Sequence, residues 1–111
     1  MEIHEIKNVS AEKLIEEIKK HIKSKYPKSR LNKEIYQKWK VGVTNNLERR
    51  YKENLPKGKT RLSYWKCWNA VTKNRAMNVE KHFCEKGFNR CQNTGLESDN
   101  SKYVYVFRLP E

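Results

Sequence analysis

The sequence predicts a small α+β domain in which a three-stranded sheet packs against helices. Two observations support this prediction: segments with helical spacing of apolar residues alternate with short runs of β-branched and aromatic residues, and polar turn residues separate them. The length of 111 residues fits one domain. Only 36% of the residues are hydrophobic, but twelve aromatic side chains can fill a core of modest size.

The first 34 residues predict an arm and an amphipathic helix packed on the remainder of the domain, residues 35–111. Residues 1–9 form a short arm that alternates weakly and suits an edge strand. Ser10 is a good N-cap, and Pro27 ends the helix that follows. The apolar positions of this helix recur at helical spacing, and they are Leu14, Ile15, Ile18 and Ile22.

The remaining elements alternate between strand and helix. Strands are expected at 35–44 ("IYQKWKVGVT"), 62–68 ("LSYWKCW") and 103–107 ("YVYVF"), the last being the densest in β-formers. A helix after Asn45 or Asn46 carries Leu47, Tyr51 and Leu55 on one side. A second helix runs from Thr72 to Gly87.

The charge points to a polyanionic partner. The chain has 25 Lys and Arg against 13 Asp and Glu, a formal net charge of +12 spread along its length. Such a balance favours nucleic acid as the partner, although a solvated lysine-rich face requires no ligand. Three cysteines without a CxxC pair indicate no disulfide framework and a reducing compartment, and no segment suits a membrane span or a signal peptide. We therefore expect a soluble, cytoplasmic protein.

Two charged residues lie beside the predicted buried stripes. Glu80 lies beside Val79 and one turn before Phe83 and Cys84, so it needs a cation or an arginine as a partner if it is buried. Arg50, next to Tyr51, lies one turn after the strand end, where its planar fork can hold a phosphate. A phosphate-binding arginine and a cation-binding carboxylate are the minimum for phosphodiester cleavage. A plain ion pair of Arg50 with Glu53 or Glu80 is the structural alternative.

The stretch "WKVGVTNNLERRYKEN" (39–54) resembles the second half of the GIY-YIG nuclease motif, and "RAMNVEKHFCEKG" (75–87) resembles the Ala-x-x-x-Glu helix of that superfamily. The resemblance extends over residues 39–107 and is closest to small bacterial proteins of the Trp-Tyr-Ile-Gly-Ile-Thr-Asn-Asp type that end in Ser-Lys-Tyr-Val-Tyr. It implies a GIY-YIG-like domain over residues 35–111 and cleavage of nucleic-acid phosphodiesters with Mg²⁺ or Mn²⁺. Arg50 matches the catalytic arginine and Glu80 the metal-binding glutamate.

The sequence departs from this family at the groups that activate the nucleophile. The first motif is missing, and Tyr36 in "EIYQK" is out of register with its tyrosine. Lys40 replaces the tyrosine of the second motif, where it can hold a phosphate, and Asn54 stands where members often carry His. The candidate catalytic residues are therefore Arg50, Glu80, Lys40 and Tyr36, and the nucleic-acid-binding residues are Arg49, Lys52, Lys73 and Arg75.

Two further functions stay open at this stage. One is a non-catalytic module that binds nucleic acid, nucleotide or protein on a degenerate nuclease scaffold of phage-related origin. The other is an interaction protein whose positive charge meets an acidic protein surface. Trp39, Tyr64, Trp65 and Trp68 could stack bases, although strand aromatics are more often core residues. A zinc site at His82 and Cys84 is disfavoured, because residues two apart on a helix diverge.

Overall fold

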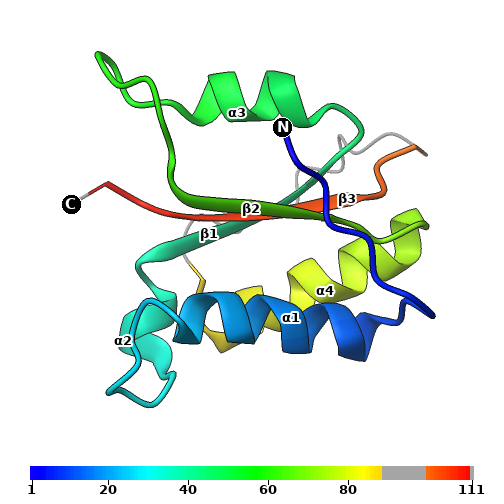
Figure 1. The fold of residues 1–111 in the computed structure, drawn as a ribbon, viewed down its shortest axis with the longest axis horizontal. Helices are drawn as coiled ribbons and strands as arrows, with labels where there is room; N and C mark the ends of the chain where they lie inside the picture. The colour runs from blue at the N-terminus through cyan, green and yellow to red at the C-terminus, as the bar shows by residue number, and fades with distance from the viewer. Residues whose placement is uncertain (89–99, 111) are drawn as a thin grey trace.

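The computed structural model describes residues 1–88 and 100–110, and these residues confirm the α+β class (Figure 1). The helices are α1 (Ala11–Lys23), α2 (Lys33–Tyr36), α3 (Leu47–Asn54) and α4 (Lys73–Lys86). The strands are β1 (Trp39–Thr44), β2 (Ser63–Asn69) and β3 (Tyr103–Arg108). The sheet is antiparallel throughout and has the order β1-β3-β2. The last strand in the sequence is therefore the central one.

The start of β1 differs from the sequence prediction. A strand was expected from Ile35, but Ile35 and Tyr36 belong to the short helix α2 and the strand begins at Trp39. The Asn32 side chain caps α2 by accepting a hydrogen bond from the backbone nitrogen of Ile35 at 3.0 Å. This local cap outweighs the β-propensity of Ile35 and Tyr36. In the helical turn both side chains are buried.

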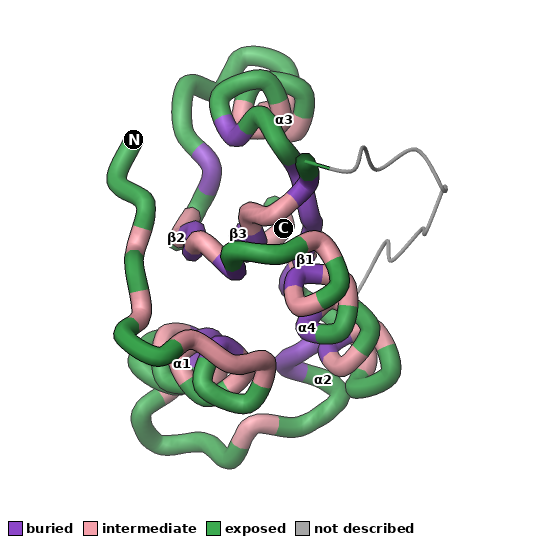
Figure 2. Tube along the Cα trace, turned by 90° about the vertical axis from the view of Figure 1, so that its right-hand side faces the viewer, coloured by how far each residue is buried: buried purple, intermediate pink, exposed green. Residues whose placement is uncertain are grey.

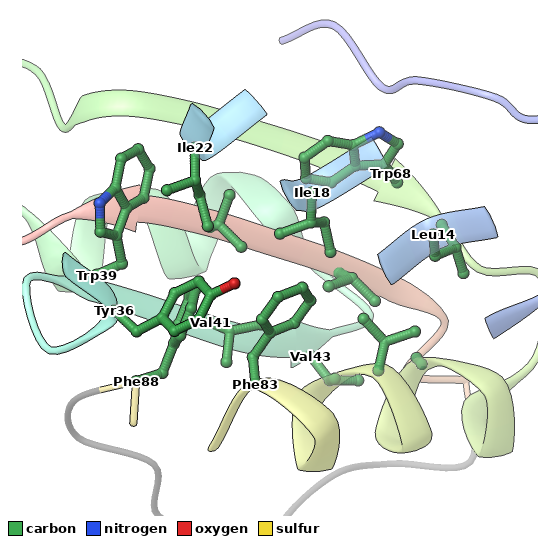
Figure 3. Packing of buried hydrophobic residues seen from close by; sticks show 14 of the residues in the cluster. Leu14, Ile18, Ile22, Tyr36, Trp39, Val41, Val43, Trp68, Phe83 and Phe88 are labelled. Atoms are coloured by element: carbon green, nitrogen blue, oxygen red, sulfur yellow. The ribbon is translucent and has the colours of Figure 1, made fainter. Parts of the chain in front are cut away.

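One face of the sheet is covered by α1, α2 and α4, and these enclose the larger core (Figure 2). Ser10 caps α1 as expected, and its buried residues Leu14, Ile18 and Ile22 lie in this core with Phe83 of α4. Figure 3 shows these side chains facing Val41 and Val43 of β1. The N-terminal helix thus shares one continuous core with the rest of the chain.

Within the part of the chain that the structure describes, α3 covers the opposite face, over a smaller core. Its buried members are Leu47, Leu62, Cys67, Tyr105 and Phe107. Trp65 packs here, stacked on Tyr105, whereas Tyr64 stacks on Trp39 across the other face. Trp65 and Tyr64 thus lie on opposite faces of the sheet. The strand order leaves β1 as an edge strand between α3 and α4 (Figure 2).

The N-terminal arm lies along the free edge of β2. His4 forms a parallel bridge with Trp68, donating its backbone N–H to the Cys67 carbonyl and accepting from the Asn69 N–H, each at 3.0 Å. This pairing satisfies part of an otherwise open sheet edge. Within the described residues, no helix is both long and apolar enough to cross a bilayer.

Candidate functional site at the edge of β1

The candidate site begins with a close contact between Gly42 of β1 and Tyr105 of β3. The two residues are paired in the sheet, and the tyrosine ring lies over the glycine. A Cβ atom at residue 42 would lie 2.2 Å from the Cζ and Oη atoms of Tyr105. Only glycine therefore lets the phenol extend across β1.

Helix α3 brings Arg50 to the same region. Asn46 caps the helix through the Arg49 backbone nitrogen at 3.1 Å, and buried Leu47 fixes the helix against the sheet. Arg50 is half-buried, and its Nη1 donates to Glu53 Oε2 at 3.2 Å. Arg49 is exposed and lies 3.5 Å from the other oxygen of Glu53. One carboxylate thus bridges both arginines.

Asn54 connects the polar groups of the site. Its Oδ1 accepts from Lys40 Nζ at 2.7 Å, and its Nδ2 donates to the Arg50 carbonyl at 2.8 Å. The lysine that replaces the motif tyrosine is thereby linked to the last turn of α3.

Nearby groups shift the pKa of the Tyr105 phenol. Burial raises this pKa above the usual 10.0, with further increases from the carboxylates of Glu80 and Glu53, while Arg50 and the Asn54 side chain lower it. Tyr105 is 3% exposed and is therefore a neutral phenol at physiological pH. Arg50 from α3 and Glu80 from α4 act on one hydroxyl, although their helices cover opposite faces of the sheet (Figure 2).

Helix α4 holds Glu80 at the margin of the larger core. Ala76, Val79 and Phe83 are fully buried, and Glu80 is half-buried beside them, as its spacing predicted. Thr72 caps the helix through the Arg75 nitrogen at 3.2 Å. The site thus combines a half-buried carboxylate, arginine and lysine with a buried phenol at the edge of one strand.

The predicted phosphate-contacting residues lie in two places. Arg49 and Lys52 are exposed on α3, beside Arg50. Lys73 lies in the first turn of α4, seven residues or roughly 10 Å of helix axis before Glu80. Arg75 Nη1 donates to the Ala70 carbonyl at 3.0 Å, which ties it to the loop before the helix.

Tyr36 does not join the group around Tyr105. It is 6% exposed, and its ring lies edge-on to Phe83 and tilted against Phe88 in the larger core (Figure 3). Burial raises its pKa. Tyr36 is a core residue, because the short helix α2 turns it inward. Tyr105 is not among the candidate residues predicted from the sequence, although it lies in "YVYVF", the strongest predicted strand.

The cysteines correct one expectation. Cys67 is a free, buried thiol, but Cys84 is disulfide-bonded. The spacing argument against a disulfide is therefore wrong at Cys84, and the cysteines no longer support a reducing compartment. Among residues 1–88 and 100–110, no group of three or more His, Cys, Asp or Glu side chains could hold a metal ion.

Comparison with models of protein families, with curated proteins and with solved structures found no match to this chain.

Proposed function

We propose that this chain is a nucleic-acid-binding, GIY-YIG-like domain that hydrolyses phosphodiester bonds with a divalent cation. The observation that carries the proposal is that the charges of Arg50 and Glu80 both act on the pKa of the Tyr105 phenol, while Asn54 links Lys40 to Arg50 by hydrogen bonds. The sequence resemblance already matched Arg50 and Glu80 to the catalytic arginine and glutamate. A net charge of +12 suits a polyanionic substrate.

Tyr105 supplies the tyrosine of the missing first motif. The central strand β3 pairs with β1 and presents Tyr105 opposite Gly42, the glycine of the second motif. In this proposal the strand order along the chain is permuted, so that the tyrosine strand follows the Arg and Glu helices. In this proposal Tyr105 takes the role of the first-motif tyrosine, although it lies at a different place in the sequence.

The chemistry divides among these side chains. Arg50 and Lys40, both half-buried, bind the non-bridging oxygens of the scissile phosphate and stabilise its developing charge. The neutral phenol of Tyr105 donates a hydrogen bond to an oxygen of the reacting group. Asn54 is a positioning residue, because it accepts a hydrogen bond from Lys40 and donates one to the Arg50 carbonyl.

Glu80 would hold Mg²⁺ or Mn²⁺. Magnesium is commonly bound by one or two carboxylates, with water and substrate phosphate as the other ligands, so a single glutamate beside a phosphate site fits this ion. A closed protein cage does not fit the described residues, which offer no larger cluster of ligands. When bound, the cation supplies charge neutralisation and a more acidic water.

The test is cleavage of plasmid, single-stranded DNA and single-stranded RNA with Mg²⁺ or Mn²⁺. The parent should cleave at least one substrate, and Arg50→Ala and Glu80→Ala should each lower the rate by about a hundredfold or more. Arg30→Ala removes an equal charge from an exposed loop and is the matched control, with an unchanged rate. Cleavage that persists in both site variants would refute the assignment.

A non-catalytic module is the second candidate, and the contacts of Glu53 favour it. This carboxylate engages Arg50 at 3.2 Å and Arg49 at 3.5 Å, so a phosphate must compete with it. Binding of nucleic acid by the parent without cleavage under any metal would support this candidate. In either case the affinity should fall steeply with salt, as phosphate neutralisation requires.

A further inference from the structure

Tyr64 is an exposed aromatic residue held in a strained backbone conformation. Its φ of +57° lies in the left-handed region, at a register shift of β2 between Ser63 and Lys66. The side chain is 44% exposed, and it is the one aromatic among the large exposed apolar residues of the described chain. Backbone strain of this kind tends to occur where a binding or catalytic role needs it.

The Tyr64 ring has a fixed support beneath it. It stacks on Trp39 with ring centres 6.1 Å apart and planes at 22°, and Trp39 is fully buried. His21 Nε2 donates to the Tyr64 carbonyl at 2.8 Å, which holds the bulge to α1. The His21 ring in turn meets Trp39 and Trp68 edge-on. The exposed ring therefore cannot fold away into the core.

The surroundings of Tyr64 are positively charged. Lys25 Nζ lies 4.8 Å from the centre of the Tyr64 ring, and Lys66 Nζ lies 5.4 Å from that of Trp68. Burial lowers the pKa of His21, and the charges of Lys66 and Lys25 lower it further. Lys25 is an exposed lysine on a flexible stem, so its ammonium can leave the ring and pair with a phosphate.

We propose that Tyr64, Lys25 and Lys66 form a stacking platform for an unpaired base of single-stranded nucleic acid. The inference rests on the proposed function and names its substrate class. A base offers a π-face to Tyr64, while the lysines neutralise the phosphates on either side. Bases within a duplex are already stacked on each other and cannot use this surface. The platform lies on the face covered by α1, whereas Arg50 and Tyr105 lie on the α3 side.

The test compares an oligothymidylate with an abasic oligonucleotide of equal length, which has the same backbone charge but no bases. The affinity of the parent and of Tyr64→Leu and Tyr64→Phe is measured by fluorescence anisotropy, without metal so that no cleavage occurs. The parent should bind the oligothymidylate about tenfold more tightly than the abasic strand. Tyr64→Leu should lose this preference while binding the abasic strand as the parent does, and Tyr64→Phe should keep it.

The outcomes separate this proposal from the proposed function. An undiminished preference for bases in Tyr64→Leu, or no preference in the parent, would overturn the platform and leave the Arg50 site standing. Absence of any binding by the parent would overturn both. The far-ultraviolet circular dichroism of each variant establishes that it is folded, and the preference of the parent for bases still tests the platform if the leucine variant does not fold.

Discussion

Replacing Gly42 by alanine tests the close approach on which the candidate site is built. The new Cβ would lie 2.2 Å from two atoms of the Tyr105 ring. Carbon atoms normally approach to about 3.5 Å, so the ring must withdraw by more than about 1 Å. It cannot do so freely, because it stacks on Trp65 with ring centres 4.9 Å apart and is 3% exposed.

The expected cost is about 2–3 kcal/mol of unfolding free energy, typical of overpacking a core. Without the clash, a glycine-to-alanine change at a permissive position would stabilise the folded protein by about 0.4–1 kcal/mol, because it lowers the conformational entropy of the unfolded chain. The sign of the effect is therefore diagnostic. Urea denaturation measures it, and the melting temperature should fall by about 10 °C.

A double-mutant cycle identifies the cause. In a Tyr105→Ala background there is no ring to meet, so adding Gly42→Ala should cost nothing or stabilise the protein slightly. An equal cost in both backgrounds would refute the explanation, because the clash would then involve something other than Tyr105. A single variant Gly42→Ala as stable as the parent would refute the geometry itself.

Three further predictions concern the hydrogen bonds and protonation of the fold. Asn54→Ala removes the bonds to Lys40 and the Arg50 carbonyl, so the unfolding free energy should drop by about 1–2 kcal/mol; an unchanged urea midpoint would contradict this. Thr72→Ala should cost about 1 kcal/mol by uncapping α4, with Thr72→Ser as the silent control. Burial lowers the folded-state pKa of His21 below 6.5, so the unfolded chain binds the extra proton and stability should fall as the pH drops below about 6.5. Since burial also lowers the pKa of His82, His21→Gln should reduce this loss without abolishing it, and an identical pH profile for parent and variant would count against the assignment.

The sequence predicted correctly those helices and strands whose local residue pattern agrees with their place in the fold. Ser10, Asn46 and Thr72 cap their helices as their positions predict, and "YVYVF" is a strand. It failed at Ile35 and Tyr36, whose β-propensity is overridden by the Asn32 cap and by the core that receives both side chains. Short segments of this kind are decided by long-range packing, which periodicity does not report.

For the candidate site, the sequence indicated Arg50 and Glu80 but missed Tyr105, the residue whose pKa both charges affect. Helical spacing places each charged residue beside a buried stripe, and the structure agrees for both. The role of Tyr105 depends on the strand order β1-β3-β2, which sets a C-terminal strand beside Gly42. Strand order is a property of the whole chain, so no local pattern around "YVYVF" could have shown that Tyr105 lies beside Gly42.

The most direct test of one shared site is the line broadening caused by Mn²⁺ in nuclear magnetic resonance spectra of the ¹⁵N-labelled protein. With a short single-stranded oligonucleotide present, bound Mn²⁺ should broaden the amide signals of Gly42, Tyr105 and the Asn54 side chain, and Glu80→Gln should abolish the effect. Broadening confined to other parts of the chain, or unchanged by Glu80→Gln, would contradict the convergence of Glu80 and Arg50 on Tyr105.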